Sequence, residues 1–376
     1  MKKTRVIALL LGLILALSLF SGCGKEEEAA DSSGVYTCVH DFEKAAKYLE
    51  SDDVVLVVNG EEMNWEEYLP WLRYSIYTYE AQTGTTITDW DAVDESLGCT
   101  YEEYILDLVD YNLYQYKGIE ACAPEFGGSL TEEDEDAMEE EWETSSESYG
   151  GEDVFAGFID EAFGSREFYD YLLGLSYMYN NAYESQYGLK GEKLSDEDVL
   201  DYTAGDGYMM AKHILFMTVD RTTNEPLPDD EIAKQRETAE EILGDLRAYE
   251  GDDIEGYFTE LMNEYSEDTG LLGFPDGYLF QTGEMVPEFE EATLSQGEYE
   301  ISDIVETTYG YHIVMTLPIN VDVVPSAYSS YGSDYTLRYI TAWDMYNAQV
   351  DEWVAATIIE KTGDYDRINL SEVFGE

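Results

Sequence analysis

The sequence predicts an α+β fold in which a mixed domain is inserted into a mainly helical one. Between Tyr208 and Leu317, strand patterns enclose a cluster of helical patterns, as is typical of α+β domains. Amphipathic helical patterns lie on both sides of this segment. The last pattern, from about Tyr335 to Ile359, cannot bury its apolar stripe as a single helix. We therefore expect it to pack on the N-terminal helices.

The amino terminus has the order of a secretory signal. Three basic residues precede an apolar run, Val6 to Phe20, and a small-residue pair then precedes Cys23. The run is shorter than the roughly 20 residues of a membrane span. Residues 1–22 are thus expected to be a lipoprotein signal peptide, with Cys23 as the lipidated (palmitate-bearing) first residue. The alternative is an ordinary cleaved signal in which Cys23 is incidental. The first interpretation predicts a lipid-anchored protein on the extracytoplasmic face of the cell membrane.

The composition is strongly acidic, with a formal net charge of −64. Such a surface repels nucleic acid and anionic lipid headgroups, so we expect no nucleic-acid partner and attachment to the membrane through acyl groups alone. The chain is 44% hydrophobic and has 33 tyrosines, enough to build cores. The sequence therefore predicts acidic surfaces over aromatic-rich interiors.

Metal chemistry is not expected. Cys38, Cys99 and Cys122 lack CxxC spacing and neighbouring histidines, which argues against a zinc site. Export permits a disulfide among them, but free thiols are an equal alternative and no pairing is predicted. The acidic stretch from Thr131 to Tyr149 is interpreted as a solvated helix or a mobile excursion.

Domain boundaries follow from changes in pattern. Residues 23–52 begin with a polar stretch and are expected to be a flexible tether. An N-terminal helical chaperone domain is expected at 53–205. It opens with a strand, Val54–Val58, an Asn-Gly turn, and a helix whose start has the capping-box spacing of Asn64 and Glu67. Pro70 predicts a kink in this helix or a later first turn.

The inserted domain is expected at 206–318, after a Gly-containing break at 204–207. Its predicted order is a strand (209–217), a long helix (229–249), a second helix (254–265), a Gly-rich loop, a short helix (287–294) and two closing strands. Residues 319–376 are expected to be a C-terminal helical segment that packs on the N-terminal domain.

Two of the three histidines lie in apolar strand patterns of this domain. His213 lies within Ala-Lys-His-Ile-Leu-Phe, and His312 within Tyr-Gly-Tyr-His-Ile-Val. A polar ring on each of two strands can meet its partner across one sheet. For either histidine alone, a satisfied core residue is the more common interpretation.

Four blocks in this segment together resemble the parvulin family of peptidyl-prolyl isomerases. They are AKHILF, the YSEDT loop at 265–269, the GEMVPEFE block at 283–290, and YGYHIV. The resemblance implies a small antiparallel sheet with surrounding helices. The flanking helical halves resemble, less specifically, the chaperone domains of PrsA-type and SurA-type foldases. Their N-terminal part often begins with a turn like Val-Asn-Gly at 58–60.

The resemblance implies a set of site residues. His213 and His312 correspond to the paired histidines, and Asp268 to a position that is Cys or Asp in the family. The apolar substrate-binding residues implied are Met285, Phe289, Leu272 and Phe216. The sequence departs from the family at Gly-Leu-Leu-Gly (270–273), where many members have Gly-Asp-Leu-Gly, so the position of Leu272 is less secure. Arg221 alone follows His213 in its loop, so no preference for phosphorylated substrates is expected.

The implied activity is cis-trans isomerisation of X-Pro bonds in unfolded or partly folded exported proteins. The amide barrier is roughly 18–20 kcal/mol, and about 4 kcal/mol of stabilisation accelerates rotation a thousandfold. An apolar pocket that holds the proline ring can supply this without a nucleophile or a cofactor. The histidines and Asp268 are then expected to shape and polarise the pocket floor. Two alternatives stay open: a catalytically weak parvulin-fold holdase, and a solute-binding lipoprotein built from two doubly wound lobes.

Overall fold

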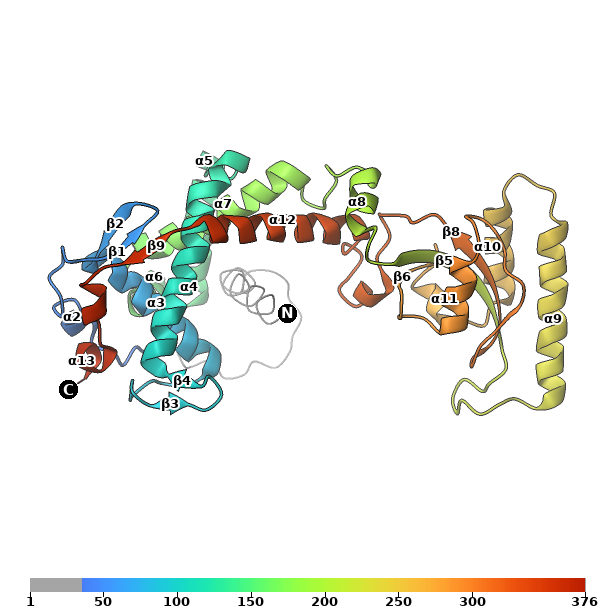
Figure 1. Cartoon of the computed structure of the whole chain (residues 1–376), viewed down its shortest axis with the longest axis horizontal. Coiled ribbons are helices and arrows are strands. Elements are labelled where there is room, and N and C mark those ends of the chain that lie inside the picture. Colours follow the sequence, from blue (N-terminus) through green and yellow to red (C-terminus); the bar gives the residue numbers. More distant parts are fainter. Residues whose placement is uncertain (1–35, 376) are drawn as a thin grey trace. The chain divides into compact units, whose positions relative to one another are not determined.

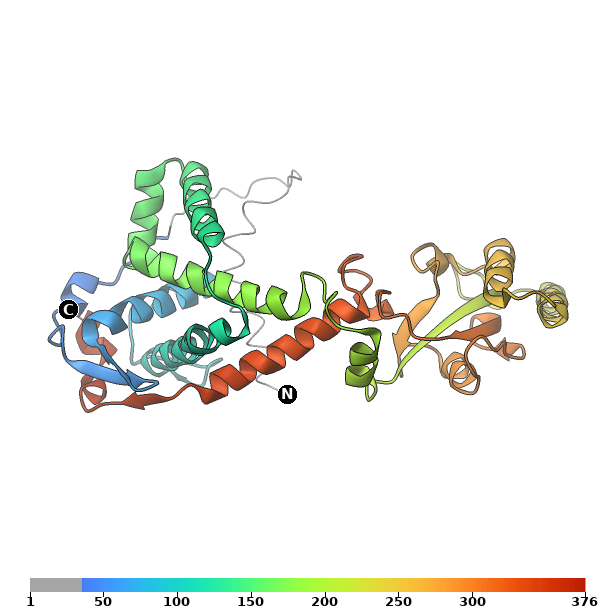
Figure 2. The same cartoon turned by 90° about the horizontal axis from the view of Figure 1, so that it is seen from above.

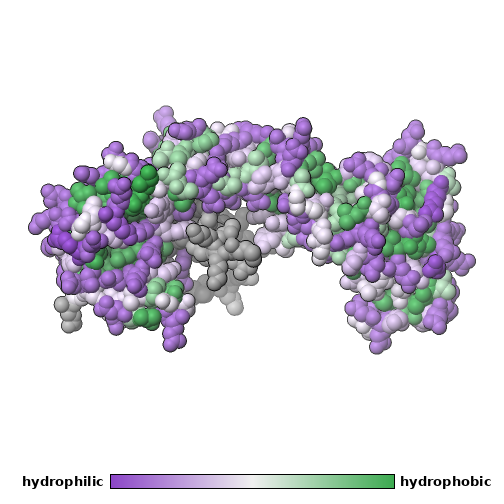
Figure 3. Space-filling model, viewed as in Figure 1, coloured by the Kyte–Doolittle hydropathy of each residue, from purple (hydrophilic) through white to green (hydrophobic). Residues whose placement is uncertain are grey.

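The computed structural model describes residues 36–375, which form two compact units. Unit 1 holds the described residues up to 186 together with 346–375, and unit 2 spans 187–345. Small antiparallel sheets and many helices make up both units, which confirms the predicted α+β class with an inserted domain (Figure 1). Figure 3 shows hydrophilic residues over most of the visible face, with apolar patches between them.

Unit 1 is mainly helical. Its helices are α2 (Phe42–Ala45), α3 (Trp65–Thr83), α4 (Tyr101–Cys122), α5 (Glu132–Ser148), α6 (Glu152–Ala162), α7 (Arg166–Tyr187, ending at the unit boundary), the second half of α12 (Leu337–Ala356), and α13 (Leu370–Phe374). The strands β1 (Val54–Val58), β2 (Glu61–Asn64) and β9 (Ile359–Lys361) form a sheet of order β2-β1-β9. A two-stranded ladder joins β3 (Val93–Asp94) to β4 (Cys99–Thr100). The pairing of β9 with β1 brings the last part of the chain onto the first strand.

Local signals explain where these helices begin. Asn64 accepts from the Glu67 N–H, and Glu67 accepts from the Asn64 N–H, so the predicted capping box opens α3. Thr100 and Glu103 do the same for α4. Pro70 lies inside α3, and the helix continues through it to Thr83 rather than beginning after it. The acidic stretch is helix α5, and Trp142 anchors it by being almost fully buried.

Part of the expected tether is folded. Residues 36–52 were expected to be flexible, yet Ala45 and Leu49 are buried, and the Trp65 indole N–H donates to the Ala45 carbonyl. Tyr36 and His40 both bond to the buried carboxylate of Glu80. The few apolar residues of this polar segment therefore suffice to pack it into unit 1. Residues 1–35, including the predicted signal peptide and Cys23, lie outside the described residues.

Unit 2 is built on a four-stranded antiparallel sheet. Its strands are β5 (Tyr208–Met217), β6 (Tyr278–Gln281), β7 (Val305–Glu306) and β8 (Gly310–Leu317), in the order β6-β5-β8-β7. The helices α9 (Asp229–Ala248) and α10 (Ile254–Tyr265) cover one face, and α11 (Pro287–Leu294) covers the other (Figure 2). A short 3-10 turn, η3 (Thr269–Leu272), follows α10. These helices begin and end within about a residue of the predicted positions.

The two faces of the sheet carry separate cores. Met210, Ile214 and Phe216 pack on the side of α9 and α10, whereas Met209 and Ala211 pack on the side of α11. This alternation follows from the two-residue period of a strand. Each polar side chain of β5 is therefore assigned to one face by its position.

Unit 2 is wider than the expected 206–318 at both ends. Helix α8 (Asp196–Thr203) adds Val199 and α12 adds Leu337 to the core that contains Ile214. Both side chains are fully buried. The expected C-terminal segment 319–376 is thus divided, with 319–345 in unit 2 and the rest in unit 1.

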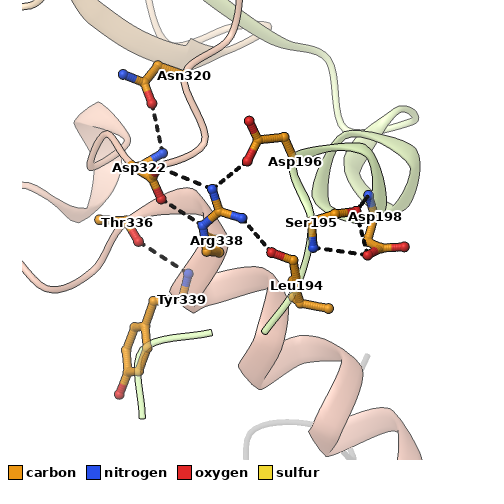
Figure 4. Close-up of polar contacts among 9 residues, drawn as sticks. All are labelled: Leu194, Ser195, Asp196, Asp198, Asn320, Asp322, Thr336, Arg338 and Tyr339. Atoms are coloured by element: carbon orange, nitrogen blue, oxygen red, sulfur yellow. Dashed lines mark hydrogen bonds and ion pairs between the residues drawn. The ribbon is translucent and has the colours of Figure 1, made fainter. Parts of the chain in front are cut away.

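Arg338 fastens these added segments together (Figure 4). Its guanidinium donates to both carboxylate oxygens of Asp322, at 2.7 and 3.1 Å, to Asp196 at 2.5 Å, and to the Leu194 carbonyl at 2.6 Å. The side chain is only 12% exposed. One cation therefore joins the start of α12 to the start of α8 and to the chain that follows β8.

Three structural findings bear on export and metal binding. Within residues 36–375 no helix is both long enough and apolar enough to cross a membrane. The three cysteines in this range, Cys38, Cys99 and Cys122, are free thiols. Nor does this part of the chain bring together three or more His, Cys, Asp or Glu side chains as a metal site.

Candidate active site

The two strand histidines meet on the α11 face of the unit 2 sheet. His213 in β5 pairs in register with Val314, and Leu215 pairs with His312 in β8, so the two rings occupy neighbouring positions on adjacent strands. Their Nδ1 atoms are 2.9 Å apart, and the ring planes differ by 15°. Both side chains are buried, at 6% and 4% exposure. The sheet thus imposes a direct hydrogen bond between two imidazoles.

Asp268 extends this contact into a chain of hydrogen bonds. Its Oδ2 lies 2.8 Å from Nε2 of His213 and accepts from the Tyr278 hydroxyl at 2.7 Å, while Oδ1 accepts from the Gly270 N–H at 2.9 Å. The loop that carries Asp268 is tied to β5, because the Glu267 N–H donates to the Leu215 carbonyl. The carboxylate is therefore fixed beside the histidine pair by backbone pairing.

The charge states of the network follow from burial and these bonds. Burial opposes ionisation of Asp268, but the hydrogen bonds from His213, Tyr278 and Gly270 outweigh it and hold the pKa of this carboxyl well below its usual range. Burial, and next the charge that His213 would carry, lower the pKa of His312 to about 3. Asp268 is thus a carboxylate and His312 is neutral at neutral pH.

A proton arrangement along this chain of hydrogen bonds follows from the carboxylate of Asp268, which can only accept. Nε2–H of His213 donates to Asp268, so Nδ1 of His213 accepts from Nδ1–H of His312. Nε2 of His312 then accepts from the Thr307 hydroxyl, 2.9 Å away, and that hydroxyl accepts from the Tyr309 N–H. The protons are assigned from this bonding pattern. The result is a directed chain from Thr307 to Asp268.

A cavity of about 440 Å³ opens above this chain. Leu215, Met217, Met285, Val286 and Phe289 supply its apolar wall. The Phe289 ring meets the His213 ring nearly edge to face, with centroids 5.2 Å apart. The remaining lining residues are polar or aromatic: Arg221, Asn224, Glu267, Thr269, Tyr278, Glu284 and Tyr309, together with the two histidines and Asp268.

Glu290 shapes the loop that presents Met285 to the cavity. This glutamate is 9% exposed, and its Oε1 accepts from the backbone N–H groups of Gly283 and Met285, at 2.8 and 3.0 Å. A buried carboxylate that receives two N–H bonds fixes the backbone around it. The side chain of Met285 is thereby held at the cavity wall.

Five of the expected site residues surround this cavity, namely His213, His312, Asp268, Met285 and Phe289. Leu272 does not: it is 93% exposed at the end of η3, outside the cavity lining. Phe216 is also misplaced, because it is 2% exposed in the core under α9 and α10. A residue three positions after His213 on a strand points to the opposite face, so Phe216 cannot line the pocket.

Sequence reasoning missed several residues of the site. The two-residue strand period counted from His213 would have selected Leu215 and Met217. Tyr278 and Thr307 carry no comparable local signal, since β6 and the turn before β8 bring them to the site only in the folded sheet. Glu290 belongs to the GEMVPEFE block, but its role depends on burial.

Comparisons with known proteins agree with this geometry. The PPIC-type PPIase (rotamase) domain family matches residues 213–317, which contain the histidine pair, Asp268 and the cavity wall. The chain contains a parvulin domain. The matched family model is that of a PPIC-type peptidyl-prolyl isomerase domain.

Two curated relatives extend the similarity beyond the parvulin domain. The foldase protein PrsA of Oceanobacillus iheyensis is 29% identical over 230 residues, which are 59% of this chain and 66% of the relative. The foldase protein PrsA of Caldanaerobacter subterraneus subsp. tengcongensis is 28% identical over 87% of this chain and 88% of its own length. The chain thus spans just under two thirds of the first relative and most of the second. The crystal structure of PrsA from Bacillus subtilis, 21% identical, covers 87% of this chain and 99% of its own chain with a TM-score of 0.26.

Proposed function

We propose that this protein is a peptidyl-prolyl cis-trans isomerase that assists the folding of exported proteins at the outer face of the cell membrane. The observation that carries the proposal is the histidine pair and Asp268 beneath a cavity of about 440 Å³ with an apolar wall, all within the parvulin domain. Its substrates are X-Pro bonds in unfolded or partly folded exported proteins.

The cavity suits a catalyst that stabilises a twisted amide. A proline ring seated against Met285 and Phe289 is held while the preceding carbonyl rotates and loses its conjugation with nitrogen. Only contacts that are better in the twisted state than in the planar one accelerate rotation. The role of His213, His312 and Asp268 is to keep the floor of the cavity rigid and polar. Each polar side-chain atom in this chain of hydrogen bonds already has a partner.

The place of action rests on the sequence. The basic start, the short apolar run and Cys23 support a cleaved lipoprotein signal and a lipid anchor on the extracytoplasmic face. The same export signal fits clients that cross the membrane unfolded. Mass spectrometry of the membrane-extracted protein tests this: a lipid-modified Cys23 at the mature amino terminus is expected, and an unmodified or retained signal would contradict the anchor.

The isomerase proposal is tested by the cis-to-trans rate of short X-Pro peptides with the full-length protein in mild detergent. Acceleration by the wild type, lost by at least about tenfold in His213→Ala and in Met285→Ala, is expected. Leu272→Ala is the control, since this apolar side chain from the same domain lies outside the cavity. Equal losses in the control, or no acceleration by the wild type, would refute the assignment of the pocket.

A holdase without turnover is the alternative outcome of the same experiment. It predicts suppressed aggregation of an unfolded client with no change in X-Pro rates. A solute-binding lipoprotein is not favoured, because it requires doubly wound parallel sheets, whereas every strand pair among the described residues is antiparallel.

A further inference from the structure

Unit 1 contains a groove larger than the proline pocket. Its volume is about 690 Å³, against about 440 Å³ for the pocket in unit 2. The lining comes from β2 and the turn before it, the first turns of α3, the end of α4 and the start of α7. All of these elements belong to unit 1. None of the residues assigned to the isomerase site takes part.

The floor of this groove is aromatic. Trp71 of α3 meets Phe168 of α7 edge to face, with ring centroids 5.1 Å apart, and Phe168 stacks with Tyr171 at 6.1 Å. Trp71 is 2% exposed and forms the base, while Phe168 and Tyr171 are only half buried. Apolar ring surface is therefore available to a bound side chain, and aromatic faces also attract cations.

The rim of the groove carries an excess of negative charge. Five of its lining residues are glutamates and one, Lys117, is basic. The Lys117 ammonium is already taken, since it donates to Glu120 at 2.7 Å and to the Tyr171 hydroxyl at 2.9 Å. A ligand of positive charge is the complement of such a rim.

Three of these glutamates remain available to a ligand. Glu67 is held in the capping box of α3, and Glu120 is paired with Lys117. Glu61, Glu62 and Glu167 are exposed, and no basic side chain within residues 36–375 forms an ion pair with them.

The edge of a sheet runs along this groove. β2 is the outermost strand of the order β2-β1-β9, and three of its four residues line the groove. An edge strand presents backbone groups to which an extended chain can add. An extended polypeptide therefore fits this groove better than a compact small molecule.

We propose that this groove binds an extended segment of another polypeptide in which Lys or Arg residues alternate with aromatic or aliphatic ones. The apolar residues contact Phe168 and Tyr171, and the cationic residues pair with Glu61, Glu62 and Glu167. The proposal adds to the isomerase function a second contact with the client, one that does not require proline.

The test uses fluorescently labelled peptides without proline and the full-length protein. One peptide alternates Lys with Leu and Phe, and a second has Glu in place of every Lys. The altered protein is the triple variant Glu61→Gln, Glu62→Gln, Glu167→Gln. Its matched control is Glu140→Gln, Glu143→Gln, Glu147→Gln, which removes the same charge from exposed positions of α5. All six positions are exposed, so neither triple variant disturbs a core.

Fluorescence anisotropy at low and high salt gives the affinities. We expect the basic peptide to bind, the acidic peptide not to bind, and the groove variant to weaken the basic peptide about tenfold while the control changes it little. Phe168→Ala should weaken binding at both salt concentrations, because its contact is apolar. The proposal would be refuted if both triple variants weakened binding of the basic peptide equally, or if the wild type bound the two peptides equally well.

X-Pro rates measured on the same variants separate this inference from the isomerase function. Groove variants should isomerise short peptides at the wild-type rate. Peptide binding without any isomerisation would refute only the isomerase, and isomerisation without peptide binding would refute only the groove.

Discussion

Replacing Glu290 with alanine is the most direct test of how the pocket is built. The substitution removes a buried acceptor and leaves the N–H groups of Gly283 and Met285 without their partner. A hydrogen bond to a charged group contributes about 1.5–3 kcal/mol, so two of them correspond to a loss of about 3 kcal/mol or more in the free energy of unfolding. Glu290→Gln keeps an amide oxygen in the same place and should lose about half as much.

The assay combines urea unfolding with isomerase rates at a temperature where all variants stay folded. In Glu290→Ala the released loop no longer holds Met285 at the wall, so the isomerase rate should fall with stability. Glu291→Ala is the control, because the adjacent glutamate on α11 is exposed. Two results would refute this reasoning: a loss of stability and rate in Glu291→Ala equal to that in Glu290→Ala, or an equal loss in Glu290→Gln and Glu290→Ala. Either would show that Glu290 does not act by accepting the two N–H bonds.

Three further predictions follow from the described contacts. Arg338→Leu removes the hydrogen bonds from the guanidinium to Asp322, Asp196 and the Leu194 carbonyl, and should lower the unfolding free energy by about 2 kcal/mol in urea titrations, allowing for its exposed partners. His312 has a pKa lowered from 6.5 to about 3, so the unfolded chain binds this proton more readily. The stability that neutral His312 contributes is fully present above pH 6.5 and is lost as the pH falls towards 3. The free energy of unfolding, measured by urea titration across this range, should fall accordingly. Peptides with Lys before proline should be isomerised about fivefold faster than those with Glu, because three carboxylates line the pocket (Glu267, Asp268 and Glu284) against one cation, Arg221.

Each of these predictions has its own control. Arg247→Leu removes an exposed arginine with a single partner and should lower the free energy of unfolding by under about 0.5 kcal/mol. A loss equal to that of Arg338→Leu would show that the contacts of Arg338 have no special stabilising role. A His312→Gln variant should show a shallower loss of stability between pH 6.5 and 3, and an unchanged slope would assign the effect elsewhere. The charge preference should shrink at high salt, and a preference for Glu before proline would refute it.

The fold was accessible from the sequence where signals are local. The capping pair of Asn64 and Glu67 locates the start of α3, and the four blocks between 211 and 314 locate the inserted domain and most of the residues proposed for its site. Errors arose where tertiary contacts decide. The chain from 36 to 52 has a polar composition, and a few buried contacts, such as that of Ala45 with Trp65, overrule it.

The site residues show the same division. His213 and His312 were found because a histidine in an apolar strand is conspicuous in the sequence. Phe216 belongs to the AKHILF block, but a strand has two faces and this position points to the one under α9 and α10. Leu272 was misassigned because the loop sequence departs from the family, and here η3 turns this side chain into solvent.

Because unit 1 is made of two separated chain segments, its sheet can be completed only after the rest of the chain has been synthesised. Residues 56–58 of β1 pair with residues 359–361 of β9, so the sheet whose first strand is synthesised earliest is the last to be completed. All strands of the unit 2 sheet lie between 208 and 317, and they have emerged long before the chain ends. Contacts so distant in sequence form late. A chain cut shortly after residue 345 would retain the whole parvulin domain, whereas unit 1 would lack a strand and half of α12. Proteolysis in α12 after residue 345 would therefore impair unit 1 while leaving the parvulin domain whole.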